Sequence, residues 1–216
     1  MQQPYQVATQ AQSTLTRQNR VLRNTYFLLA ISMLPTIGGA ALGMAFGSRF
    51  ISLFVYHPIL SAVVFFGISW GLIWGIQRTK ESAMGVALLL LFTFFIGLML
   101  TPILSFALAL SNGAQLIGAA AGGTASIFLV MAGVATVTKK DFGFLGKFLT
   151  VGLIVLFIAL VANMFFRIPA LYLALSVACV ALFSLFILYD VSRVINGGET
   201  NYITATLSIY LDIYNV

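Results

Sequence analysis

The feature that most constrains this chain is a series of long segments that contain no charged residue. They run over residues 25–48, 50–77, 82–137, 148–166, 168–189 and 201–211. A helix needs about 20 apolar residues to cross the hydrocarbon core of a bilayer, and only the last segment is too short. The pattern predicts several membrane-spanning helices.

Composition supports this interpretation and excludes a soluble fold. The 216 residues include 11 Lys or Arg and 5 Asp or Glu, so 7% are charged, against about 25% in a soluble domain. With a mean hydropathy of +1.05, the chain cannot cover a surface that faces water. The net charge of +6 is not clustered on a polar face, so no nucleic-acid binding is expected. We predict an all-α polytopic membrane protein whose surroundings are the lipid bilayer.

The 82–137 segment is long enough for two spans and must be divided. Ser111-Asn112-Gly113 is a turn signal, and it separates spans at 83–104 and 115–137. Seven helices result, so residues 24–216 are expected to form a seven-helix transmembrane domain behind a polar cytosolic N-terminal tail, residues 1–23. Only about 15 residues follow the last loop, giving about 22 Å of helix, so the last helix is expected to continue beyond Val216.

The distribution of basic residues predicts the orientation. With the N-terminus in the cytosol, nine basic residues lie on that side and two, Arg49 and Arg167, lie on the other. The nine are Arg17, Arg20, Arg23, Arg78, Lys80, Lys139, Lys140, Lys147 and Arg193. Because cytosolic loops carry the excess of Lys and Arg, we predict a cytosolic N-terminus.

Glycines recur at intervals of four residues in two places. Gly39, Gly43 and Gly47 form one set, and Gly67, Gly71 and Gly75 form the other. Small residues at this spacing let helix backbones approach closely. Packing between helices of this chain is favoured over a homodimer contact, because a seven-helix bundle has many internal interfaces.

Catalytic chemistry has little support. Residues 67–71 match the G-x-S-x-G pattern around Ser69, but they lie in an apolar helix without the strand-to-helix turn that exposes such a serine. The single histidine, His57, is twelve residues away, about 18 Å along a helix. One cysteine, Cys179, excludes an internal disulfide. The protein is not expected to be an enzyme.

Two of the five acidic residues stand out. Glu81 and Asp141 follow lysines in loops, and Glu199 lies in a Gly-Gly loop. Asp190 ends an apolar stretch, and Asp212 follows three apolar or aromatic residues. A carboxylate inside a span costs about 2.5–3.5 kcal/mol on insertion scales, so it needs a partner, a shared proton or a water cavity.

The last two helices form a hairpin that could bring these two acids together. Asp190 and Asp212 are each eleven residues from Asn201, so a turn centred there places them level, whereas a turn centred on Gly198 separates them by about 9 Å. A pair would share a proton, sense pH and, when deprotonated, attract a hard divalent cation through its oxygen atoms. The alternative is that Asp190 pairs with Arg193, one turn later, and Asp212 bonds a hydroxyl or an amide.

Several segments resemble a known family. YD at 189–190, GGETNYI at 197–203 and ATLSIYLDIYN at 205–215 resemble the signature of the transmembrane Bax inhibitor motif family, also called the Bax inhibitor-one family. VLRNTYFLL at 21–29 and KDFGFLG at 140–146 are similar to its bacterial YccA branch. The resemblance covers nearly the whole chain.

This resemblance implies a seven-helix bundle with a central last helix and a cytosolic N-terminus. It also implies a pH-sensitive calcium leak in which Asp190 and Asp212 form the pH sensor and the ion site. In such proteins a basic residue latches the first aspartate in the closed form, and Arg78 is the nearest candidate here. No tightly bound cofactor is expected, and calcium is the expected ion.

The YccA branch implies a different function. The resemblance to this branch implies a protein of the bacterial inner membrane that is a substrate and a modulator of a membrane-bound AAA protease of the FtsH type. The tail before Arg17 would be the handle that such a protease grips. Since both acids are present, the sequence favours the calcium leak and keeps the protease modulator as the alternative.

Overall fold

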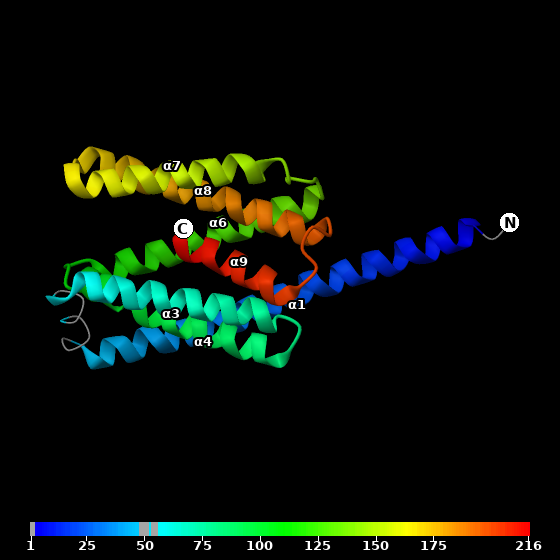
Figure 1. Ribbon diagram of the computed structural model, residues 1–216. Coiled ribbons are helices and arrows are strands. Elements are labelled where there is room, and N and C mark those ends of the chain that lie inside the picture. Colours follow the sequence, from blue (N-terminus) through cyan, green and yellow to red (C-terminus); the bar gives the residue numbers. More distant parts are fainter. Residues whose placement is uncertain (1–2, 48–51, 53–55) are drawn as a thin grey trace. The chain divides into compact units, whose positions relative to one another are not determined.

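The computed structural model describes residues 3–47, 52 and 56–216, and all regular elements in these ranges are helical (Figure 1). The main helices are α1 (Gln3–Phe46), α3 (Pro58–Thr79), α4 (Ala83–Met99), α5 (Thr101–Leu108), α6 (Gly113–Thr138), α7 (Leu145–Phe166), α8 (Pro169–Ile195) and α9 (Tyr202–Asn215). Helices pair their backbone groups internally, as a bilayer core without water requires.

Six spans in the described ranges are long and apolar enough to cross a membrane, with α4 and α5 taken as one span. The prediction of an all-α polytopic membrane protein is confirmed. The shorter α9 is the seventh helix of the sequence analysis, and eight of its 14 residues are buried. A central last helix and a cytosolic N-terminus stay predictions.

Most of the predicted span boundaries agree with the structure to within a few residues. The turn at Ser111-Asn112-Gly113 separates α5 from α6 as expected. Leu100 separates α4 from α5, and Pro102 follows two residues later in the first turn of α5, where proline lacks the N–H that a continuous helix needs. Arg49 and the predicted span ends at residues 48 and 50 lie outside the described residues.

Two helices are longer than the uncharged segments that predicted them. α1 begins at Gln3, so the polar tail, as far as it is described, is the start of the first helix and not a separate segment. Between Tyr5 and Leu34 the sequence has neither glycine nor proline to end a helix. α8 continues to Ile195, which places Asp190 inside a helix instead of at its end.

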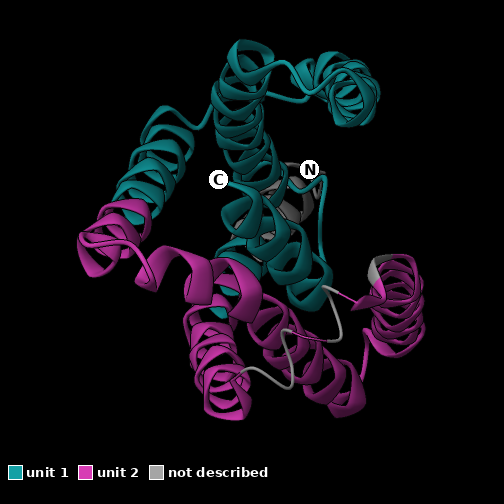
Figure 2. Cartoon of the chain, turned by 90° about the vertical axis from the view of Figure 1, so that its left-hand side faces the viewer, with its two compact units in different colours: residues 1–24, 123–216 teal, residues 25–122 magenta. Residues whose placement is uncertain are grey.

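The chain forms two compact units (Figure 2). Residues 1–24 and 123–216 form the first, in which α8 packs against both α7 and α9. Residues 25–122 form the second, in which α3 packs against α4. The two acids singled out by the sequence both belong to the first unit, and Arg78 belongs to the second.

Glycines allow α1 and α4 to approach closely within the second unit. A Cβ atom added to Gly39 would overlap the backbone of Phe94, and one added to Gly97 would overlap the backbone of Thr36. Gly43 lies against the side chain of Thr101. The predicted packing within the chain is therefore confirmed for Gly39 and Gly43.

The second glycine set behaves differently. An added Cβ atom on Gly75 would lie 3.1 Å from Leu88, but within the part of the chain that the structure describes nothing lies within 4 Å of one on Gly67 or Gly71. Spacing alone did not distinguish the glycines that pack from those that do not.

These contacts predict opposite effects for two similar substitutions. Gly97→Ala should destabilise the protein by about 1–3 kcal/mol, because the methyl group meets rigid backbone. The control Gly71→Ala should leave the stability unchanged or raise it, since alanine has the higher helix propensity. Thermal unfolding in detergent measures both, and equal melting temperatures for the two variants would contradict the close packing of α1 and α4.

Candidate functional site between α8 and α9

The Gly-Gly loop ends α8. Gly197 adopts a left-handed conformation with φ of +78°, which favours glycine. The N–H groups of Gly198 and Glu199 then donate to the carbonyl oxygen of Arg193, at 2.8 and 3.1 Å. A left-handed glycine with such a bond back to the last turn is a common way to end a helix. The turn therefore folds back onto α8.

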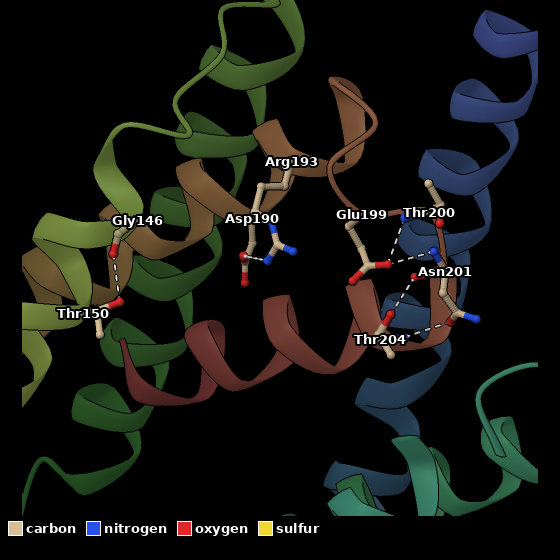
Figure 3. A network of polar contacts seen from close by, with 8 residues as sticks. All are labelled: Gly146, Thr150, Asp190, Arg193, Glu199, Thr200, Asn201 and Thr204. Atoms are coloured by element: carbon tan, nitrogen blue, oxygen red, sulfur yellow. Dashed lines mark hydrogen bonds and ion pairs between the residues drawn. The ribbon is translucent and has the colours of Figure 1, made fainter. Parts of the chain in front are cut away.

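The next residues start α9 (Figure 3). The Oε1 atom of Glu199 accepts hydrogen bonds from the backbone N–H groups of Thr200 and Asn201, at 2.8 and 2.9 Å. The Oδ1 atom of Asn201 accepts from the N–H groups of Ile203 and Thr204, at 2.8 and 3.1 Å. Glu199, which the sequence placed only in a loop, thus helps to fix the beginning of α9, and Asn201 caps it.

Asp190 has a partner on its own helix. The Nη1 atom of Arg193 lies 3.5 Å from the Oδ1 atom of Asp190, one turn earlier, as Figure 3 shows. The Asp190 side chain is 13% exposed and that of Arg193 is 36% exposed. The Arg193 guanidinium also lies over the ring of Tyr189, at 5.5 Å from its centre. Arg193 therefore compensates part of the negative charge at this end of α8.

Asp212 lies on α9, beside Asp190. The two carboxyl groups are neighbours within reach of a side-chain hydrogen bond. Asp212 is 6% exposed, and its Oδ2 atom is buried with no hydrogen-bond partner among the described residues. A carboxylate only accepts hydrogen bonds, so a bond between the two groups requires that one of them carry a proton.

The sequence left two registers open for this hairpin, one centred on Asn201 and one centred on Gly198. The helices end at Ile195 and begin at Tyr202, so counting between them would centre the turn near Gly198. The geometry brings Asp190, Arg193 and Asp212 together, and their roles as pH sensor, charge partner and ion site stay predictions.

A calcium site at these acids would need further ligands. In the described ranges, no group of three or more His, Cys, Asp or Glu side chains is placed to hold a metal ion. Calcium takes six to eight oxygen ligands. Asp190 and Asp212 could supply carboxylate oxygens, and water or backbone carbonyls would have to supply the rest.

The other candidate residues, Arg78, His57 and Ser69, belong to the second unit. The Arg78 guanidinium lies over the ring of Trp74, at 5.2 Å from its centre, and its predicted role as a latch on Asp190 stays a prediction. His57 precedes the first turn of α3, whereas Ser69 lies in the middle of the same helix. About 18 Å of helix separates them, so they cannot exchange a proton directly.

Two residues that the sequence analysis did not single out connect this site to another loop. Ser192 is fully buried, and its Oγ atom accepts a hydrogen bond from the Phe142 N–H at 3.0 Å and donates to the Lys140 carbonyl at 3.1 Å. The Asn196 side chain also donates to the Lys140 carbonyl, at 3.2 Å. Their spacing of four residues places both on one face of α8, but it gives no hint of the partner.

The spans define the class: this is an integral membrane protein with several helical spans. The family described as "Inhibitor of apoptosis-promoting Bax1" matches residues 18–216. The chain belongs to this family, the Bax inhibitor family, as its motifs indicated.

Relatives from several bacteria cover most of the chain. A protein of Neisseria meningitidis serogroup A is 42% identical over 92% of this chain and 87% of the relative. "Modulator of FtsH protease YccA" of Escherichia coli K12 is 38% identical over 94% of this chain and 89% of the relative. "Inner membrane protein YccA" of Escherichia coli O6:H1 is similar to the same extent. The resemblance to the YccA branch is confirmed.

The cap of α9 yields a test of the site's local stability. Asn201→Ala should cost about 1 kcal/mol, because the N–H groups of Ile203 and Thr204 lose their shared acceptor. Asn201→Ser retains an acceptor oxygen and should recover most of that loss. Thermal unfolding in detergent compares the two, and an alanine variant as stable as the serine variant would show that the cap does not stabilise α9.

Proposed function

We propose that this protein is an inner-membrane modulator of an AAA protease of the FtsH type. The observation that carries the proposal is the similarity to the YccA protein of Escherichia coli K12, whose name describes that role and which aligns over 94% of this chain. The relative described as an inner membrane protein supports the same location here. This role needs no catalytic group in the chain, in keeping with the expectation that it is not an enzyme.

The first residues of α1 are a segment that such a protease could grip. α1 begins at Gln3, but its apolar span begins only at Thr16. The preceding residues can therefore lie in water, where an enzyme outside the bilayer can reach them. With the predicted cytosolic N-terminus, this segment would be on the side of the membrane where ATP is available.

Deletion of residues 2–16 tests this function. The shortened protein should persist longer in cells after protein synthesis is stopped, because the protease loses its handle. If the spans still bind the protease while the missing handle prevents degradation, the degradation of a second membrane substrate should also slow. Immunoblots over time in cells with and without the protease measure both half-lives.

A variant in which residues 2–16 are replaced by an unrelated polar sequence of equal length is the control. It should be degraded like the unmodified protein if the protease needs only an accessible segment. Unchanged half-lives after the deletion, together with no copurification of a protease, would contradict the proposal.

A second candidate function is a pH-dependent calcium leak through the α8–α9 carboxyl pair. The observation that favours it is the burial of Asp212 beside Asp190, with one Asp212 oxygen left unpartnered among the described residues. An acid in such a place has a functional role by default. Loss or gain of the shared proton would change the local charge and the packing of α9 on α8.

Calcium flux in liposomes tests the leak. Flux through the purified protein should depend on pH near neutrality, and Asp212→Asn should abolish or alter that dependence because the amide does not titrate. Asp141→Asn is the matched control, since it removes one exposed carboxylate in a loop. Unchanged flux and pH dependence in the double variant Asp190→Asn with Asp212→Asn would exclude the pair mechanism.

A further inference from the structure

We propose that the loop between α6 and α7 binds the phosphate of an anionic phospholipid headgroup. Lys139, Lys140 and Lys147 would contact the phosphate, and Phe144 would enter the adjacent acyl region. The loop joins two apolar spans, so it lies at a membrane surface whichever way the protein is oriented. This site does not depend on the function proposed above.

The charges of the loop favour an anion. The side chains of Lys139, Lys140 and Lys147 are all exposed, and the described residues provide no recorded carboxylate partner for them. The one acid nearby, Asp141, accepts a hydrogen bond from the Gly143 N–H at 2.7 Å, so it closes its own turn. α7 begins with no acidic residue in its first turn, and the positive end of its dipole adds to the same field.

The backbone at Lys139 supports a role for its side chain. The N–H of Lys139 donates to the Ala135 carbonyl at 3.1 Å, and Lys139 adopts a left-handed conformation with φ of +51°. Glycine is the usual residue where a helix ends in this way, because a side chain is strained there. This conformation fixes the position of Lys139 at the end of α6.

The loop is held in place by α8. Ser192 and Asn196 bond to the backbone of Lys140 and Phe142. The ring of Tyr189 lies directly against Gly146, where an added Cβ atom would come within 2.7 Å of the tyrosine oxygen. The backbone that carries the lysines is therefore fixed before a ligand arrives, which lowers the entropy cost of binding.

The aromatic residue identifies a lipid as the occupant. Phe144 is 74% exposed, directly before the first residue of α7, and its ring lies 6.4 Å from that of Phe142. An exposed phenyl ring at the end of a membrane span can enter the acyl region below the headgroups. Lysines beside the end of a span attract anionic headgroups in the same layer. A soluble anion would use the lysines but not the ring.

Binding of phosphatidylglycerol to the purified full chain tests the site. The triple variant Lys139→Gln, Lys140→Gln and Lys147→Gln should bind about a hundredfold more weakly at low ionic strength, from about fivefold per lysine. The control variant Arg17→Gln, Arg20→Gln and Arg23→Gln removes the same charge from the start of α1 and should weaken binding much less, by only the general attraction of basic residues to an anionic lipid. Native mass spectrometry and lipid-dependent thermal shifts measure the affinities, with phosphatidylcholine as the neutral lipid.

Two further arms separate the possible outcomes. Phe144→Ser leaves every charge in place and should also weaken binding of phosphatidylglycerol, which covers the case that the triple variant does not fold. Glycerol phosphate should compete poorly, because it lacks acyl chains. Equal losses in the lysine and arginine variants, unchanged binding by Phe144→Ser, or full competition by glycerol phosphate would each overturn the proposal.

Discussion

The hydrocarbon core of a bilayer offers no water to pair with the backbone, so each span must satisfy its own N–H and carbonyl groups. Polar side chains in the spans follow the same constraint. The hydroxyl groups of Ser32, Thr36, Ser184 and Thr206 each donate to the carbonyl four residues earlier in their own helix. Contacts between helices are therefore left largely to close packing, and Gly39 and Gly97 allow it between α1 and α4.

The turn between α8 and α9 is where this pattern of internal pairing changes. Its backbone groups are satisfied around Gly197 and by Asn201, but Asp190 pairs with Arg193 and Asp212 keeps one buried oxygen with no hydrogen-bond partner among the described residues. A buried carboxyl group without a full set of partners is costly in an apolar environment. Local capping thus stabilises the turn. The unfavourable free energy that remains comes from burying the carboxyl groups of Asp190 and Asp212.

Asp190 and Ser192, close together on α8, lie on different faces of the helix. Asp190 lies toward α9, whereas Ser192, two residues later and therefore about 200° around the helix, bonds the loop between α6 and α7. The acid pair and the lysine loop are thus fixed to opposite faces of one helical turn. α8 thus contacts α9 and the loop between α6 and α7 with different faces.

Uncharged segments determined the helical class, the position of most spans and the turn at Ser111-Asn112-Gly113, because a bilayer imposes length and hydropathy on any span. Motifs around Asp190 and Asp212 determined the family. At the start of α1 and at the end of α8 the helices extend beyond the uncharged segments, because a charged residue does not end a helix. Only the tertiary structure decided which glycines pack and that Ser192 bonds the loop at Phe142. Such contacts depend on how helices far apart in sequence are placed side by side, which no local pattern of residues specifies.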